Sequence, residues 1–120
     1  MKQYKITENN ITYDIEEQFD GDKTWYKNGK RHRENGPACE WSDGTKHWYK
    51  NGLYHRDDGP AFEDICGYKA WYKNGKRHRI DGPAIEYRSE KKEYWHNGKR
   101  LEYINSDEEL KRYIKLLSIA

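Results

Sequence analysis

Apolar and polar residues recur along this chain with a fixed period of 23 residues. The phrase Trp25-Tyr26-Lys27-Asn28-Gly29 returns at 48–52 and 71–75, and a variant of it occupies 94–98. In each copy, strand-forming residues flank Asn-Gly, a pair that favours a two-residue type I′ hairpin turn. A short internal period indicates a stacked array of small units. The pattern therefore predicts an elongated, mostly β array of antiparallel hairpins.

The second half of each unit predicts two further chain reversals. His-Arg is followed by Gly-Pro-Ala at the same spacing in three copies, and a turn-forming Asn or Asp precedes each Gly-Pro. Asp43-Gly44 predicts another two-residue hairpin turn. Gly21 and Gly67 occupy the position of Gly44, whereas Glu90 replaces glycine in the fourth copy. Each unit is thus expected to contain two hairpins.

Counting outward from these turns gives the expected strand register. Around the Asn-Gly turn, Trp25 faces His32 and Tyr26 faces Arg31. Alternation of side chains along a strand then defines two faces of the sheet. Around the Asp-Gly turns, three pairs are expected on the buried face with Trp25: Cys39 with Trp48, Phe62 with Trp71, and Ile85 with Tyr94.

The opposite face is expected to be at least partly open and supplies the candidate binding residues. It places an aromatic ring beside an arginine in three of the four copies, as in Tyr26 beside Arg31. These residue types are enriched at interface hot spots, although a structural ladder of cross-strand pairs explains the repetition equally well. In the second copy, Leu53-Tyr54 gives an apolar centre with basic neighbours. The candidate partner-binding residues are Tyr26, Arg31, Tyr49, Leu53, Tyr54, Tyr72, Arg77, Trp95 and Arg100.

The two ends of the chain are expected to cap the array, because an open array exposes its core. Residues 1–21 alternate apolar and polar positions on both sides of an Asn-Asn pair, which predicts an N-terminal hairpin. The repeats fill 22–101 as three and a half units. Ser106 and Glu109 match a capping box that opens a helix over 106–118. The chain is then one domain, and the helix either caps the last repeat or docks on a partner.

Composition changes this picture only slightly. Apolar residues make up 33% of the chain and charged residues 37%, but 15% of the residues are aromatic, so we expect a thin sheet with an aromatic core. The net charge of +2 is compatible with an anionic partner without requiring one. Cys39 and Cys66 occupy different repeat positions, and we find no signal peptide or membrane-spanning run. A soluble cytoplasmic protein with reduced cysteines is expected.

The repeat resembles the MORN repeat, which combines an aromatic residue, Asn-Gly-Lys, a following histidine and a later Asp-Gly. Here these elements are Trp25-Tyr26, Asn28-Gly29-Lys30, His32 and Asp43-Gly44. The chain departs from that family at Arg33, where MORN repeats usually have glycine. The form Trp-Tyr-x-Asn-Gly-Lys-x-His-Arg-x-x-Gly-Pro-Ala is similar to small repeat proteins of bacteriophages and large DNA viruses.

This resemblance implies a meander of β-hairpins and a binding function. MORN arrays are associated with protein contacts and with anionic lipids, so a protein partner is expected. An anionic lipid or a nucleic acid is the alternative, because rows of basic and aromatic residues also suit a phosphate backbone. A phage origin would imply an inhibitor that occludes a host protein, such as a defence factor, in the host cytoplasm. A homodimer is compatible with the same pattern.

Catalysis and metal binding through the repeated positions are not expected. Successive units lie about 10 Å apart, whereas zinc needs donors about 2 Å from one ion. A packed ring that bonds a backbone carbonyl therefore explains His32, His55 and His78. Ion pairs with the arginine after each histidine explain the repeated acidic residues Glu40, Glu63 and Glu86. The sequence predicts no enzyme, no metal and no cofactor.

Overall fold

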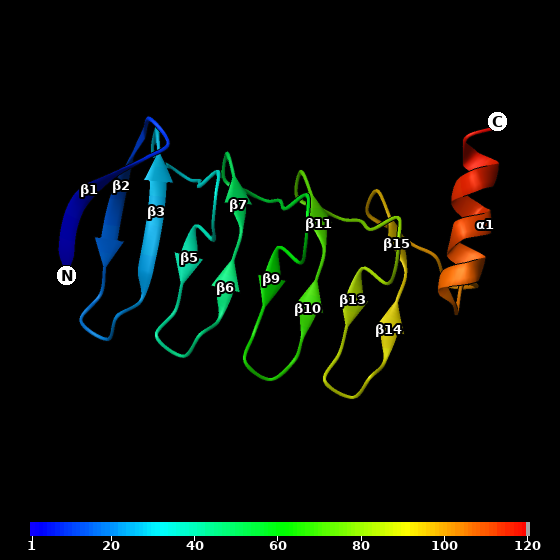
Figure 1. The fold of residues 1–120 in the computed structure, drawn as a ribbon. Coiled ribbons are helices and arrows are strands. Elements are labelled where there is room, and N and C mark those ends of the chain that lie inside the picture. The colour runs from blue at the N-terminus through cyan, green and yellow to red at the C-terminus, as the bar shows by residue number, and fades with distance from the viewer. Residues whose placement is uncertain (120) are drawn as a thin grey trace.

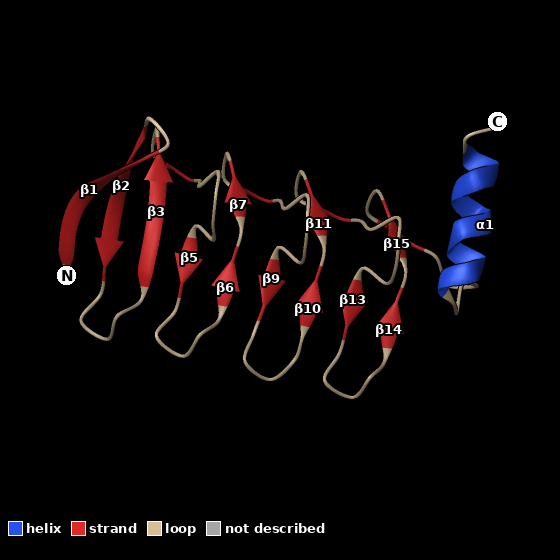
Figure 2. Ribbon diagram, in the orientation of Figure 1, coloured by secondary structure: helices blue, strands red, loops and turns tan. Residues whose placement is uncertain are grey.

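The repeats stand side by side in one row, with the N-terminal hairpin at one end and the helix at the other (Figure 1). This arrangement is that of a computed structural model, which describes residues 1–119. The molecule measures 49 × 32 × 19 Å along its principal axes, so it is elongated and thin. The expected mostly β fold with one C-terminal helix is confirmed (Figure 2).

The first three strands are long, and every later strand has two residues. The first four strands are β1 (Lys2–Glu8), β2 (Ile11–Glu17), β3 (Lys23–Lys27) and β4 (Lys30–Arg31). Those that follow are β5 (Cys39–Glu40), β6 (Lys46–His47), β7 (Tyr49–Lys50), β8 (Leu53–Tyr54), β9 (Phe62–Glu63), β10 (Lys69–Ala70), β11 (Tyr72–Lys73), β12 (Lys76–Arg77), β13 (Ile85–Glu86), β14 (Lys92–Glu93), β15 (Trp95–His96) and β16 (Lys99–Arg100). The helix α1 spans Asp107–Leu117.

One antiparallel sheet runs through the molecule in the order β1-β2-β3-β5-β6-β9-β10-β13-β14. Each Asn-Gly turn closes a short hairpin, such as β7–β8, at one side of it (Figure 2). Asn51 and Gly52 have φ values of 52° and 82°, and a type I′ turn requires positive φ at both positions. The N–H of Gly52 also donates to the carbonyl of Arg31 at 2.9 Å. The expected turn is confirmed, and it joins neighbouring repeats.

The second turn of each repeat differs from the expected one. The N–H of Gly44 donates to the carbonyl of Trp41 at 2.9 Å, and the N–H of Trp41 donates to the carbonyl of Thr45 at 2.9 Å. The loop therefore holds three residues. Of these three residues, only Gly44 has a positive φ, which is 98°. The Asp43 carboxylate accepts the N–H of Thr45 at 2.8 Å. A type I′ turn needs positive φ at both central residues, which Asp43 lacks.

The extra loop residue shifts the strand register by one, so the pairing expected around the Asp-Gly turns was wrong. The observed partners are His47 for Cys39, Ala70 for Phe62, and Glu93 for Ile85. A slip of one residue moves a side chain to the other face of the sheet. Cys39 pairs with Thr24, two residues before Tyr26, so Cys39 shares the face of Tyr26. Aromatic and apolar side chains therefore line both faces.

Glu90 adopts the left-handed backbone of this loop, with φ of 70°, where the other copies have glycine. We expect Glu90→Gly to raise the free energy of unfolding by about 0.5–1 kcal/mol, because glycine adopts this conformation without steric cost. Urea denaturation measures the change. Gly67→Glu makes the reverse exchange at the equivalent position and should destabilise the chain. Equal midpoints for these variants and the unaltered protein would show that the loop is not under strain.

The face opposite Tyr26 is built from tryptophan and arginine. The Arg79 guanidinium carbon lies 4.0 Å from the Trp71 ring centre, and Arg79 donates to the carbonyl of Pro83 at 3.1 Å. A Cβ atom at Gly82 would lie 2.7 Å from this guanidinium, so glycine leaves room for it. The same packing occurs in the preceding repeats, with Arg33 on Trp25 and Arg56 on Trp48. The His-Arg-x-x-Gly-Pro-Ala phrase is therefore a packing motif.

The expected ion pairs with these arginines form in two of the three repeats. Arg33 lies 2.9 Å from Glu40, and Arg79 lies 3.2 Å from Glu86. In the middle repeat Arg56 instead contacts Asp58 at 3.1 Å, so the expected pair with Glu63 was wrong.

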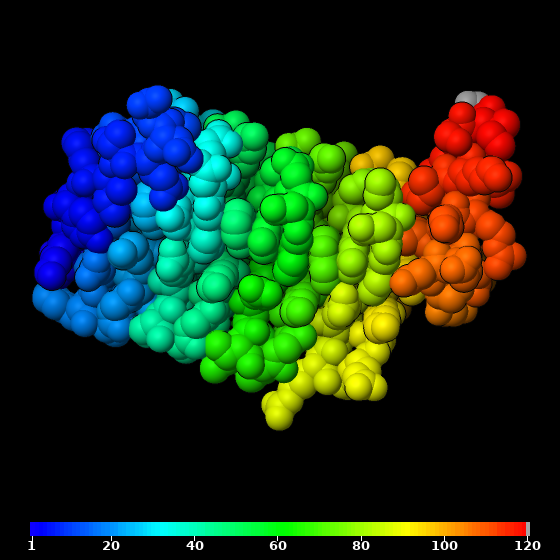
Figure 3. Space-filling model, in the orientation of Figure 1, coloured from blue at the N-terminus to red at the C-terminus, as the bar shows by residue number. Residues whose placement is uncertain are grey.

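Both ends of the row of repeats are covered, by the N-terminal hairpin and by the helix. At the N-terminal end, Tyr13 and Ile15 of β2 form a buried cluster with Trp25. At the other end, Leu110 of α1 packs with Tyr94 in a second cluster. The C-terminal end of the helix projects from the body of the molecule (Figure 3). The Ser106 half of the expected capping box is present, because the Ser106 hydroxyl accepts the N–H of Glu109. The Glu109 carboxylate contacts the Ser106 hydroxyl instead of the Ser106 backbone N–H. The helix therefore packs on the last repeat, whether or not it also meets a partner.

Candidate functional site

Six of the candidate residues form one continuous stack across the repeats, which we name the aromatic–arginine row: Arg31, Tyr49, Tyr54, Tyr72, Arg77 and Trp95. The Tyr49 and Tyr54 rings stack with centres 4.5 Å apart, and the Tyr54 and Tyr72 rings stack at 4.9 Å. The Arg31 guanidinium lies over one end, 5.4 Å from the Tyr49 ring centre, and the Arg77 guanidinium lies between Tyr72, at 5.9 Å, and Trp95, at 4.9 Å. The row crosses three junctions between repeats.

The arginines stack mainly across repeat junctions rather than within hairpins. Register pairs Tyr26 with Arg31 and Trp95 with Arg100, as expected. However, Arg31 lies over Tyr49 of the next repeat, and Arg100 lies 3.7 Å from the Glu93 carboxylate. Of the three candidate arginines, Arg77 is the one that also lies over the ring paired with it in its own hairpin, at 5.9 Å from Tyr72.

Most of the row is half-buried, so the face that was expected to be at least partly open is partly exposed. His47, which is 6% exposed, lies beneath it, and its Nδ1 is 2.8 Å from the Tyr54 hydroxyl. Burial, together with the hydrogen bond between Tyr54 and Tyr49, raises the pKa of Tyr54. Arg31 and Arg100 are exposed, whereas the four aromatic rings and Arg77 show only part of their surface. The row therefore packs within the fold and is also partly accessible to solvent.

Leu53 does not belong to the row. It pairs with Lys50 across its hairpin and is 51% exposed. Because Leu53 and Tyr54 are consecutive in one strand, they point to opposite faces. Leu53 lies over Gly75, the turn glycine of the next repeat. A Cβ atom on Gly75 would be 3.3 Å from the Leu53 side chain. The expected apolar centre formed by Leu53 and Tyr54 together is therefore wrong.

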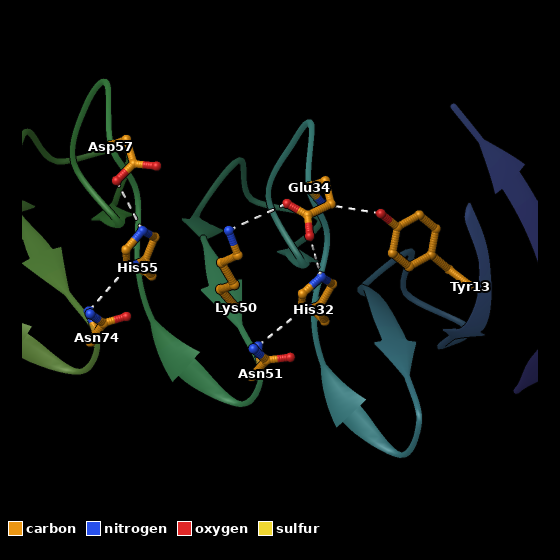
Figure 4. Close-up of polar contacts among 8 residues, drawn as sticks. All are labelled: Tyr13, His32, Glu34, Lys50, Asn51, His55, Asp57 and Asn74. Carbon is orange, nitrogen blue, oxygen red and sulfur yellow. Dashed lines mark hydrogen bonds and ion pairs between the residues drawn. The ribbon is translucent and has the colours of Figure 1, made fainter. Parts of the chain in front are cut away.

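The repeated histidines join neighbouring repeats (Figure 4). His32 Nδ1 accepts the backbone N–H of Asn51 at 2.9 Å, and His32 Nε2 lies 2.9 Å from Glu34. The hydrogen bond with His32 lowers the pKa of Glu34, with Lys50 adding to the effect. His55 makes the same contacts with Asn74 and Asp57. A packed histidine was expected, but its backbone partner is an N–H rather than a carbonyl.

Two histidines, the buried His47 and the half-buried His78, make stability depend on pH. Burial lowers the pKa of His47 and of His78, with Arg31 adding to the effect on His47 and His96 to that on His78. The unfolded chain then binds more protons than the folded chain over this range. Stability is fully present above the unfolded pKa of about 6.5 and is lost as pH falls below it. We expect the urea midpoint to fall from pH 7.5 to pH 5.5, and His78→Gln to reduce that change. A constant midpoint would contradict this.

Sequence reasoning missed several residues on the face of the row. Trp41 is 47% exposed and contacts His47, with ring centres 4.7 Å apart. Glu93 is only 8% exposed and accepts hydrogen bonds from Tyr87 and Trp95. Although burial opposes ionisation, these hydrogen bonds and nearby basic groups lower the pKa of Glu93. Counting a three-residue loop at Asp-Gly would have placed all of them on this face.

The described residues contain no constellation that indicates catalysis. No group of three or more His, Cys, Asp or Glu side chains in 1–119 is placed to hold a metal ion. No helix in the same range is long and apolar enough to cross a membrane. No protein-family model, curated protein or solved structure matches this chain. The resemblance to MORN repeats and to phage proteins therefore stays a prediction.

Proposed function

We propose that this protein is a non-catalytic binding module that docks on another protein through the face of the aromatic–arginine row. The observation that carries the proposal is the continuity of this stack across three repeat junctions. Tyrosine, tryptophan and arginine dominate interface hot spots. Rings already held in place by stacking lose little conformational entropy on docking.

The residues that surround the row favour a protein as the partner. Trp41 presents nearly half of its surface beside His47, so an apolar side chain lies next to the stack. The exposed guanidinium groups of Arg31 and Arg100 lie toward its two ends. Apolar contacts with charged groups at the rim are typical of protein interfaces. Occlusion of a host protein by a phage inhibitor is one form that this function would take.

An anionic polymer or lipid surface is the second candidate, favoured by exposed lysines at the Asn-Gly turns: Lys30, Lys50, Lys73, Lys76 and Lys99. Two of these lysines already contact acidic residues. Lys50 lies 3.6 Å from Glu34, and Lys73 lies 3.9 Å from Asp57. These contacts reduce the positive charge available to a phosphate backbone, so we favour the protein partner.

Two neighbouring positive charges on opposite faces test the proposal. Arg31 belongs to the row, whereas Lys30 is exposed on the other face of the same hairpin. We expect a partner protein to be captured by the unaltered chain and by Lys30→Ala, with roughly tenfold less captured by Arg31→Ala. Affinity purification with quantitative mass spectrometry measures this difference. Melting temperatures confirm that both variants fold.

Binding to defined anionic probes separates the two candidates. A single-stranded oligonucleotide and vesicles containing phosphatidylserine serve as probes, titrated at low and high salt. Phosphate binding weakens steeply with ionic strength and would be reduced equally by Lys30→Ala and Arg31→Ala. Salt-sensitive binding of this kind, without selective loss at Arg31, would overturn the protein-docking proposal.

A further inference from the structure

Strand β1 is a long edge of the sheet that has a partner on one side only. It pairs with β2 through its whole length, and among residues 1–119 no strand lies on its outer side. Natural sheets usually protect an edge by making it short, by covering it, or with a proline or a bulge. At the other edge of the sheet, β14 has two residues, and α1 packs on the last repeat. β1 has seven residues, an unbroken register and no proline.

The turn that follows β1 determines which backbone groups point outward. Asn9 and Asn10 have φ values of 50° and 66°, which match a type I′ turn. The residues that flank such a turn, here Glu8 and Ile11, exchange backbone hydrogen bonds. In an antiparallel pair this exchange recurs at every second residue, so the residues between them turn their N–H and C=O groups to the outer side. These residues, whose side chains are exposed as well, are Gln3, Lys5 and Thr7.

We propose that β1 pairs with β1 of a second copy of this chain, antiparallel and with a two-fold axis at Lys5, so that two sheets become one. This register matches Gln3 with Thr7 and Lys5 with its own copy, which gives about six new backbone hydrogen bonds. An axis at Tyr4 or at Ile6 would leave one of the three outward-facing residues without a strand partner. No residue of β1 belongs to the aromatic–arginine row, so this inference does not rest on the proposed function.

The side chains of β1 are complementary to themselves in this register. Lys2 lies opposite Glu8 at both ends of the paired strands, and Tyr4 lies opposite Ile6 on both sides of the axis. Opposite charges and apolar pairs that face each other stabilise antiparallel strands. Tyr4 and Ile6 pack against the buried cluster that contains Trp25, and part of their surface is exposed. The pairing would therefore continue this cluster into the second copy.

The two lysines of β1 do not prevent this pairing, although lysine on an edge strand usually discourages it. Lys5, which meets its own copy at the axis, contacts the Asp14 carboxylate of β2, and this contact offsets its charge. Lys2 meets a carboxylate instead of a like charge. Arg33 holds that carboxylate, Glu8, at 2.8 Å, and the Glu8 side chain is still 26% exposed. It is therefore accessible to Lys2 of the second copy.

Analytical ultracentrifugation over a series of concentrations tests the dimer, with a protein that carries no N-terminal tag. One pair of strands is a small interface, so we expect monomers at about 10 µM and mostly dimers at about 1 mM. Lys5→Pro removes the outward N–H at the axis and should abolish the dimer, because an edge strand tolerates proline where its N–H faces solvent. Lys5→Ala is the matched control, since it loses the same contact with Asp14 but keeps the N–H. It should still dimerise, and melting temperatures establish that both variants fold.

A charge reversal tests the register without changing the backbone. Lys2→Glu places two carboxylates opposite each other at both ends of the interface and should weaken the dimer about tenfold. Lys99→Glu makes the same change at an exposed lysine of β16 and should leave the dimer unchanged. In NMR hydrogen-exchange measurements, the amides of Gln3, Lys5 and Thr7 should exchange more slowly as the protein concentration rises.

Three results would overturn the proposal. The first is a protein that stays monomeric at every concentration. The second is a dimer of equal strength in folded Lys5→Pro and Lys5→Ala, or in Lys2→Glu and Lys99→Glu. The third is a dimer in which the exchange of the Gln3, Lys5 and Thr7 amides does not depend on concentration.

Discussion

Tyr54→Ala is expected to lower the free energy of unfolding by about 3 kcal/mol, the largest loss for any side chain of the row. The ring stacks on both Tyr49 and Tyr72 and meets Phe62 edge-on, with ring centres 6.5 Å apart. Its removal leaves a gap in the middle of the stack and takes away the partner of His47 Nδ1. Urea denaturation at pH 7.5 measures the loss.

Tyr54→Phe is the matched control for this variant. It keeps the stacked ring and removes only the hydroxyl that contacts His47, so we expect a loss of about 1 kcal/mol. If Tyr54→Ala changes stability no more than Tyr54→Phe, the rings are a loose surface feature and the row is not a packed element. The expected loss also means that Tyr54→Ala cannot report on partner binding alone, whereas Arg31→Ala can.

Gly82→Ala is expected to cost about 2 kcal/mol, because the new methyl group would occupy the space of the Arg79 guanidinium. Arg79 must then leave the Trp71 ring and its contacts with Pro83, Asp81 and Glu86. Gly82 has an ordinary backbone conformation, so the cost comes from the guanidinium and not from strain.

A double-mutant cycle isolates that cause. Arg79→Ala alone should cost about 2 kcal/mol through the lost stacking and hydrogen bonds. Adding Gly82→Ala to Arg79→Ala should then cost almost nothing, giving a coupling free energy of about 2 kcal/mol. Strictly additive losses would show that glycine is needed there for another reason.

The Asn-Gly turns were the most predictable part of the fold. Asn-Gly supplies the two positive φ angles of a type I′ turn, so Trp25 and Tyr26 were paired correctly with His32 and Arg31. Asp-Gly allowed two loop lengths. The Asp43 carboxylate accepts the N–H of Thr45, but the same three-residue loop also forms where Cys66 and Ser89 replace Asp43. The pair of residues at the turn therefore does not reveal the loop length.

Contacts between repeats were less predictable than contacts within a hairpin. Stacking of Arg31 on Tyr49 depends on how closely successive repeats approach, and no turn in the sequence sets that distance. The hydrogen bond from the Asn51 backbone N–H to His32 also joins two repeats, so it was not predictable for the same reason. Six of the candidate residues lie in one stack, but most of the contacts that join them cross the junctions between repeats, which reasoning from single hairpins did not predict.

The arginines of the row bind the partner, whereas the arginines stacked on tryptophan only pack within the fold, and arginine Nε–Hε NMR spectra test this difference directly. Adding the captured partner should shift the signals of the row arginines, Arg31 and Arg77. The signals of the packing arginines, Arg33, Arg56 and Arg79, should stay in place. Shifts confined to the packing arginines, with Arg31 and Arg77 unchanged, would contradict the assignment of the binding face.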